Sequence, residues 1–266
     1  MDNLTDLQEE IFCLKYELDA LAEISLRHKA ERWIPNFIDE RTNREHWDRY
    51  KLAIRYAKDK TILDIACGVG RGSYTLATEG SAKSVTACDI QESAIRYATF
   101  RNRHEKISFS IQDAELYKQP DTFDLIVSFE TIEHLKNYEA FLQNVYDSLR
   151  PKGIFMVSTP ISHMDVNTAP VNPYHVQEWG FEKFQQILSK RFSIIKVFTQ
   201  VIKYEPPLPF MKRALKSLSI HLGMNRHTDQ DVDSGFPKME EYKNQYRVKD
   251  LGSKFIGFQT VICEKS

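Results

Sequence analysis

The chain has 266 residues and a formal net charge of −1, and 42% of its residues are hydrophobic. A chain of this length buries a substantial core and fits one enlarged domain. Its balanced charge lacks the basic excess that binds duplex nucleic acid, so we expect no nucleic-acid partner.

The sequence also argues against secretion and membrane insertion. Residues 1–10 are acidic and lack the pattern of a signal peptide, and no apolar run is long enough to span a membrane. The four cysteines form no C-x-x-C pair, and no cluster of histidine and cysteine has zinc spacing. We therefore expect reduced thiols and a cytoplasmic protein.

Residues 1–30 are predicted to form an amphipathic helix that precedes the main domain. Aliphatic residues recur there at a spacing of 3-4-3-4-3, which is a heptad seam of fewer than three heptads. The residues of this heptad seam are Leu4, Leu7, Ile11, Leu14, Leu18 and Leu21. Two alternatives stay open: the seam packs in cis over the ligand site of its own chain, or it joins two copies as a homodimer.

The most informative segment is residues 61–72, an apolar strand that runs into a glycine-rich turn. Glycine lets the backbone turn tightly and lets a ligand approach it closely. Asp64, near the end of the strand, disfavours the pyrophosphate of a nicotinamide or flavin cofactor and suits a ligand with an ammonium group. A dinucleotide fingerprint would also need glycine at Ser73, near which the next helix is predicted to begin. The glycines of the turn are Gly68, Gly70 and Gly72.

A second acidic residue follows the next predicted strand. Residues 84–89 form an apolar strand that ends at Asp89, 19 residues beyond Gly70. A carboxylate at this spacing can accept hydrogen bonds from both hydroxyls of a bound ribose. The alternative is that Asp89 simply caps the helix that follows it.

Strand and helix patterns then alternate along the chain, which predicts a parallel sheet with helices on both faces. Ligands of such sheets bind at the carboxyl ends of the strands, where Asp64, Asp89, Asp113 and Glu130 all fall. The further strands are predicted at 107–112, 123–129 and 153–159, and the helices at 91–103, 137–149 and 178–190.

The C-terminal part departs from a minimal domain of this type. Residues 192–204 and 255–263 are predicted as a sixth and a seventh strand, separated by an insert at 205–253. Connections this long are usually functional or disordered. Part of the insert has the pattern of a basic amphipathic helix, with the cations Lys212, Arg213 and Lys216. It fits a phosphate-bearing substrate or peripheral contact with an anionic membrane, and the alternative is a lid packed on the sheet edge.

These motifs together resemble those of class I S-adenosylmethionine (SAM)-dependent methyltransferases. The chain is most similar to the branch found with polysaccharide and glycan biosynthesis, which is related to the ubiquinone-type O-methyltransferases. The matching segments are Glu31–Pro35, Asp64–Ser73, Ser128–Leu135, Ser158–Pro160 and Asn172–Val176. The resemblance implies an α/β, Rossmann-like methyltransferase domain over 31–266, with a seven-stranded, mostly parallel sheet whose last strand is antiparallel.

The resemblance assigns SAM-binding roles to matching positions. It implies that Asp89 holds the ribose, that Asp113 accepts a hydrogen bond from the adenine amino group, and that Arg32 approaches the methionine carboxylate. Alternatively, Asp113 caps a helix and Arg32 is an ordinary surface residue. The other implied positions are Asp64, Ala66, Cys67, Gly68 and Gly70 around the methionine part, Ile90 and Ala114 beside the adenine, and Ser128 and Phe129 near the sulfonium. Ala66 stands where the superfamily often has glycine.

For the reaction, the resemblance implies methyl transfer to a hydroxyl of a small-molecule acceptor: a sugar, a sugar nucleotide or a phosphorylated glycan precursor. Such a hydroxyl must lose a proton, and histidine is the commonest base for this task. The catalytic candidates are His134, His175 and Glu130, and the alternative for each histidine is a structural role. Glu130, Glu133 and His134 also resemble a divalent-metal set of some ubiquinone-type relatives, but we predict no metal.

Two other functions stay open. The first is methylation of a quinone-like phenol or a small amine. The second is SAM binding without catalysis, in which the N-terminal helix and the insert serve assembly. The intact set of acids and glycines at the strand ends disfavours this second function.

Overall fold

The computed structural model describes residues 3–27, 33–35, 37–38, 40–162, 170, 172–204, 238–242 and 255–266. Arg32 lies outside the described residues, and so does most of the predicted insert at 205–253, including Lys212, Arg213 and Lys216. The roles expected for these four residues therefore stay predictions.

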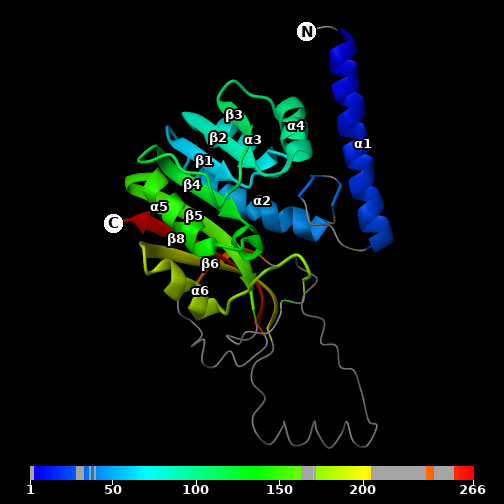
Figure 1. Ribbon diagram of the computed structural model, residues 1–266. Coiled ribbons are helices and arrows are strands. Elements are labelled where there is room, and N and C mark those ends of the chain that lie inside the picture. The colour runs from blue at the N-terminus through cyan, green and yellow to red at the C-terminus, as the bar shows by residue number, and fades with distance from the viewer. Residues whose placement is uncertain are drawn as a thin grey trace, which may run out of the picture.

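One sheet of eight strands forms the centre of the described fold (Figure 1). Its strands lie in the order β3-β2-β1-β4-β5-β8-β6-β7. Their bounds are β1 Thr61–Ile65, β2 Ser84–Asp89, β3 Ile107–Ile111, β4 Phe123–Phe129, β5 Leu149–Ile161, β6 Phe192–Tyr204, β7 Glu240–Glu241 and β8 Phe255–Lys265. Strands β1 to β5 are mutually parallel, so their carboxyl ends meet at one edge of the sheet.

The C-terminal strands confirm the predicted Rossmann-like fold with an antiparallel last strand, but the predicted strand count is wrong. Strand β8 lies between β5 and β6 and pairs antiparallel with both. The described sheet has eight strands rather than seven, because the two-residue β7 adds antiparallel to β6 from within the insert. Strand β5 begins at Leu149, before the predicted start at Gly153, because Leu149 pairs with Phe123 ahead of a register shift.

Helices cover both faces of the sheet, as predicted. Apolar side chains of α2, α3 and α4 pack on one face, and those of α5 and α6 pack on the other. The bounds are α2 Glu40–Ile54, α3 Arg71–Thr78, α4 Glu92–Arg101, α5 Tyr138–Ser148 and α6 Phe181–Leu188, and a 3₁₀ turn, η1, covers Ile132–His134. Helix α2 has no counterpart among the predicted helices.

The N-terminal helix α1 (Asn3–Arg27) stands beside α4 at the side of the sheet, away from α5 and α6 (Figure 1). Cys13 is buried there in one cluster with Tyr97 of α4 and Val69 of the glycine-rich turn. The heptad seam lies elsewhere on the helix, and all six of its side chains are exposed. The helix therefore docks in cis, but it does not dock through its heptad seam.

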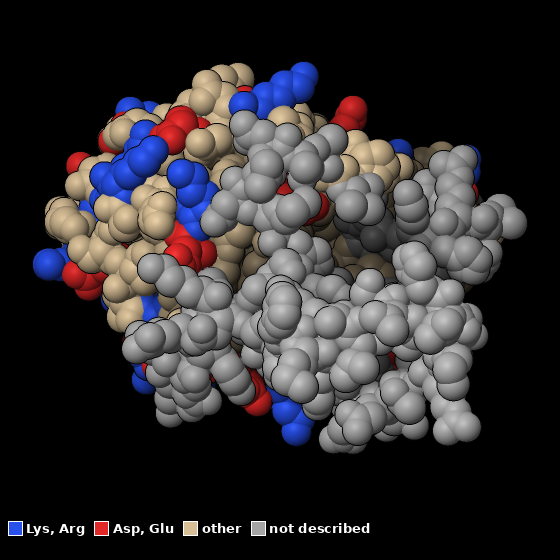
Figure 2. All heavy atoms as spheres, turned by 90° about the horizontal axis from the view of Figure 1, so that it is seen from below, with Lys and Arg blue, Asp and Glu red and all other residues tan. Residues whose placement is uncertain are grey.

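No helix in the described ranges combines the length and the apolar character that crossing a membrane requires. Seen from below, cationic and anionic side chains are interspersed over the described surface (Figure 2). The thiols of Cys13, Cys67, Cys88 and Cys263 are all buried and free.

Candidate functional site

The glycine-rich turn joins β1 to α3 through residues with positive φ: Ala66 at 62°, Gly68 at 56° and Gly70 at 74°. A side chain at Gly68 would meet no atom within 4 Å, so a ligand can approach the backbone here. A side chain at Gly72 would instead collide with the ring of Tyr50, so this glycine allows α2 to pack closely against α3. The turn is thus open on the ligand side and closed on the side of α2.

Asp64 lies beneath this turn and is buried. Its carboxylate accepts hydrogen bonds from Tyr50 Oη at 3.2 Å and from Ser73 Oγ at 2.6 Å. Burial is the largest effect and raises the pKa of Asp64 from 3.8 to about 7, although the two hydrogen bonds lower it. The serine that breaks the dinucleotide fingerprint therefore holds Asp64 in place.

Asp89 ends β2 directly beside the turn. Its Oδ2 accepts a hydrogen bond from the Gly68 N–H at 2.9 Å, and its Oδ1 accepts one from the Gln91 N–H at 2.9 Å. The carboxylate thus holds the backbone at the start of α4, yet each oxygen keeps a lone pair for a ligand. Ile90 is exposed next to it. A carboxylate beside an exposed apolar side chain suits a ribose and its attached base.

Asp113 follows β3 at the same edge of the sheet. Its Oδ1 accepts a hydrogen bond from the Glu115 N–H at 2.9 Å, which closes a local turn. Asp113 does not cap a helix, because the next element of the chain is strand β4. Ala114 and Cys67 are buried in the apolar core on the two sides of the sheet. The expected cofactor residues of the first three strand ends therefore lie at one edge of the sheet.

The end of β4 brings Ser128 and Phe129 to the same edge. Phe129 is buried and packs edge-on against the ring of Tyr50, with ring centroids 5.1 Å apart. Ser128 is fully buried, and its hydroxyl has no hydrogen-bond partner. An unsatisfied buried hydroxyl at a strand end is consistent with an adjacent ligand or water.

Glu130 follows directly and has a strained backbone, with φ at 52°. Its N–H donates to Ser158 Oγ at 3.1 Å, and Ser158 Oγ donates to Glu130 Oε1 at 2.6 Å. Arg49 of α2 brings Nη2 to 3.5 Å from the same Oε1. These contacts hold the Glu130 carboxylate on the face of the sheet that α2 covers.

Arg49 is buried, and none of its three guanidinium nitrogens makes a hydrogen bond. Its Cζ lies 4.6 Å from the centroid of the Phe258 ring. Gln200 pairs with Phe258 across β6 and β8, and its Oε1 also lacks a partner, while its Nε2 donates to Glu45 O at 3.3 Å. Buried polar groups are usually satisfied, so these atoms mark a place for the polar groups of a ligand or for water.

His134 ends the η1 turn that follows β4. Its Nδ1–H donates to the backbone carbonyl of Tyr174 at 3.0 Å, because a carbonyl can only accept. The neutral ring then carries its lone pair on Nε2, which lies 4.0 Å from Glu133 Oε1. A third of the side chain is exposed. A ring that is oriented by a carbonyl and presents a free nitrogen has the arrangement of a general base.

His175 comes from the loop after β5, and both of its ring nitrogens are occupied. Its Nδ1–H donates to the carboxylate of Glu178 at 2.6 Å, and its Nε2 accepts a hydrogen bond from Asn172 Nδ2 at 2.9 Å. The ring meets His134 edge-on, with centroids 4.8 Å apart. This geometry fits the locking of the loop and the support of His134 better than proton removal.

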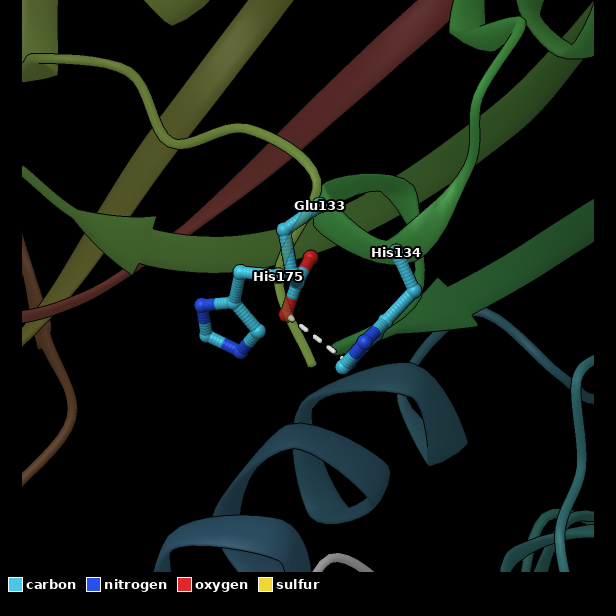
Figure 3. A group of neighbouring side chains, drawn as sticks. All are labelled: Glu133, His134 and His175. Atoms are coloured by element: carbon cyan, nitrogen blue, oxygen red, sulfur yellow. Dashed lines mark ion pairs between the residues drawn. The ribbon is translucent and has the colours of Figure 1, made fainter. Parts of the chain in front are cut away.

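One group among the described residues has metal-like spacing: Glu133, His134 and His175, whose ligand atoms lie within 4.8 Å of one another (Figure 3). Glu130 is not part of it, since its carboxylate is held by Ser158 and Arg49. Burial, and then the charge of Glu130, raise the pKa of Glu133 well above its ordinary value. Because both ring nitrogens of His175 are already occupied, we assign no metal to this group.

Helix α2 supplies site residues that the sequence motifs did not reveal. His46, Arg49 and Tyr50 recur at helical spacing, which places them on one face of a helix. Trp33 stacks on the rings of His46 and Tyr50, with centroids 5.3 Å and 5.4 Å away. The spacing was available in the sequence, but it does not show that this face meets the strand ends.

Comparison with known proteins gives two kinds of match. The family described as "Methyltransferase domain" matches residues 57–202. A probable S-adenosylmethionine-dependent methyltransferase of Mycolicibacterium smegmatis is 28% identical over 163 residues, which are 60% of this chain and 62% of that protein. A ubiquinone biosynthesis O-methyltransferase of Rickettsia bellii is 30% identical over 142 residues, which are 52% of this chain and 54% of that protein. The chain thus spans less than two thirds of the length of these curated relatives.

Solved structures share the fold. The N-methyltransferase NodS from Bradyrhizobium japonicum, in complex with S-adenosyl-L-homocysteine (SAH), has a TM-score of 0.56 at 16% identity, over 94% of this chain and 98% of that one. A phosphoethanolamine N-methyltransferase of Haemonchus contortus, in complex with SAM, has a TM-score of 0.54 at 18% identity, over 82% of this chain and 52% of that one.

Proposed function

The chain belongs to the methyltransferase-domain family, and from this membership we propose that it is a SAM-dependent O-methyltransferase. The proposed acceptor is a hydroxyl of a sugar, a sugar nucleotide or a phosphorylated glycan precursor. The observation that carries the proposal is the geometry of His134, with Nδ1–H on a backbone carbonyl and Nε2 free.

SAM fits the groups at the ends of β1 and β2. The backbone at Gly68 can be approached closely, because no atom lies where its side chain would be. Asp89 keeps lone pairs for the ribose hydroxyls, and the exposed Ile90 offers an apolar surface for the adenine. These contacts support the cofactor roles that the resemblance implies.

The acceptor roles rest on the polar groups between α2 and the ends of β4, β6 and β8. Arg49 offers N–H donors, whereas Glu130 and Gln200 offer acceptor oxygens. The charge of Arg49 is balanced by Glu130, so this cluster favours a neutral group over a second anion. A sugar ring is such a group, because each of its hydroxyls both donates and accepts. Any phosphate of the acceptor would be left to the basic residues of the insert.

SAM supplies a methyl group that its sulfonium already activates, so the protein has to align the acceptor and remove its proton. The acceptor oxygen attacks the methyl carbon in line as the carbon–sulfur bond breaks. His134 Nε2 takes the hydroxyl proton. The resulting positive ring is stabilised by the Tyr174 carbonyl, which lies 3.0 Å from Nδ1.

The test is methyl transfer from labelled SAM to a panel of nucleotide sugars and phenols at saturating acceptor. His134→Gln keeps a polar side chain of similar length but has no base, so kcat should fall by about 10²–10⁴-fold. Binding of SAH, measured by calorimetry, should not change. His175→Gln should cost about tenfold or less. His104→Gln is the matched control, because His104 packs against Tyr74, away from the acceptor groups.

Two outcomes would contradict the proposal at different points. If both site variants keep more than about a tenth of wild-type turnover, neither histidine is the base and catalysis rests on alignment alone. If the wild type binds no SAH, the cofactor assignment itself is wrong.

A quinone-like phenol is the second candidate acceptor, favoured by the similarity to the ubiquinone biosynthesis O-methyltransferase of Rickettsia bellii. A phenol ionises with a pKa near 10, far more readily than a sugar hydroxyl, so it depends less on a base. Transfer to phenols that survives His134→Gln would therefore favour this candidate.

A further inference from the structure

The heptad seam of α1 is the most continuous run of exposed apolar side chains among the described residues. Its six members expose between 39% and 66% of their surface. The other exposed large apolar residues of the described ranges are dispersed over several elements and are Ile90, Ile111, Leu116, Tyr174, Val176 and Ile195. Continuous apolar patches on a protein surface mark interaction sites.

A different face of α1 anchors the helix to its own domain. Tyr97 Oη donates to Glu17 Oε1 at 2.7 Å, and the guanidinium of Arg96 makes two hydrogen bonds of 2.9 Å to Glu9. Cys13 is fully buried between them. The helix is therefore already ordered before any partner binds, which lowers the entropy cost of using its other face.

We propose that the heptad seam binds the heptad seam of a second copy of this chain, as a parallel two-helix contact on a two-fold axis. Leu4, Ile11 and Leu18 occupy the a positions of the heptad, and leucine occupies each d position. Leucine at d with a β-branched residue at the central a position is typical of parallel two-stranded coiled coils. So short a seam is marginal for isolated helices, but here each helix is held by its own domain.

The charges beside the seam agree with a second copy arranged in parallel. Glu10, at a g position, would face Lys15 of the partner subunit at an e position, and the two-fold axis makes this pair twice. The Glu10 carboxylate already lies 2.7 Å from Arg101 Nη1 of its own chain, so in the dimer it would lie between two cations. Asp6 and Asp19 are also exposed on this helix, and their charge disfavours an anionic membrane as the occupant.

The first test is the molar mass of the full chain by light scattering. The wild type should be a dimer, and the double variant Ile11→Glu/Leu14→Glu should be a monomer, because it places four charges inside the contact. Both positions are exposed, so the melting temperature of the domain and its binding of SAH should not change. The control variant Thr5→Glu/Asp19→Glu alters exposed residues outside the seam and should stay dimeric.

The second test is the direction of the helices. Leu4→Cys puts a new thiol at the first a position, so parallel pairing brings two such thiols within reach of a disulfide. Antiparallel pairing would separate them by about 25 Å, the length of the seam. Mild oxidation should therefore give a covalent dimer, which the wild type, whose thiols are buried, does not form. A monomeric wild type, or a dimer that does not cross-link, would overturn the proposal.

Discussion

At the scale of the residue, Ala66 shows how the ligand turn imposes strain on one side chain. Its φ of 62° lies in the left-handed region, where a Cβ costs about 1–2 kcal/mol. Such strain persists only where the surrounding structure dictates it. Here the next residue, Cys67, donates its N–H to Cys88 O at 2.9 Å and so fixes the start of the turn.

We expect Ala66→Gly to stabilise the protein by roughly 0.5–1 kcal/mol, because glycine loses the strain but gains freedom in the unfolded chain. The measurement is the free energy of unfolding in urea. Ala98→Gly, in the interior of α4, is the control and should destabilise the protein. A loss of stability in both variants would show that the left-handed conformation at Ala66 carries no strain.

The sequence predicted which acidic residues lie at the strand ends, but not the direction in which their side chains point. Asp89 lies at the end of β2 as predicted, because hydrophobic periodicity locates the end of a strand. Asp64 instead lies buried beneath the turn, because its partners Tyr50 and Ser73 come from two different helices. Its orientation therefore depends on tertiary packing, which local patterns do not contain.

At the scale of the element, the predicted bounds of β2, β4 and β6 are confirmed, because each strand is a compact run of apolar and β-branched residues. The two-residue β7 escaped prediction because Glu240 and Glu241 are poor strand formers, and only pairing with β6 makes them a strand. Helix α2 escaped prediction because it is polar over most of its length. The side of the candidate site that α2 forms was therefore the least predictable part.

The docking of α1 depends on a few polar contacts, and one of them can be removed cleanly. Tyr97→Phe deletes the O–H that donates to the mostly buried Glu17 at 2.7 Å. We expect the docking of α1 to weaken by about 1–2 kcal/mol, which would make amide exchange in α1 roughly 5–30-fold faster. Hydrogen–deuterium exchange measures this change. Asp19→Asn, at an exposed position of the same helix, should leave the exchange rates as they are.

At the scale of the whole molecule, the buried Asp64 makes stability depend on pH. Burial raises the pKa of Asp64 from 3.8 to about 7. At a pH between these two pKa values, the Asp64 carboxyl is ionised in the unfolded chain but still protonated in the folded protein. The folded state thus binds more protons, so the contribution of Asp64 to stability falls as pH rises through this window and levels off above about pH 7.

We expect Asp64→Asn to match the wild type in unfolding free energy near pH 4 and to exceed it by roughly 2–4 kcal/mol near pH 8. The reason is that asparagine resembles the protonated carboxyl and cannot ionise. Urea unfolding of both proteins across this range measures the difference. Glu133, whose pKa is also raised, is present in both proteins and cancels. A difference that does not change with pH would contradict the assignment.

The position of β8 has a consequence for the order in which the molecule can form on a ribosome. The strand comes from residues 255–265, whereas its neighbours β5 and β6 end by residue 204. The intervening chain of about 50 residues takes a few seconds to translate. During that interval β5 and β6 each lack their shared neighbour, and unpaired strand edges attract foreign strands. The cation–π contact between Arg49 and the Phe258 ring also cannot form until β8 has been synthesised. The part of the sheet that brings Phe258 against Arg49 is therefore completed last.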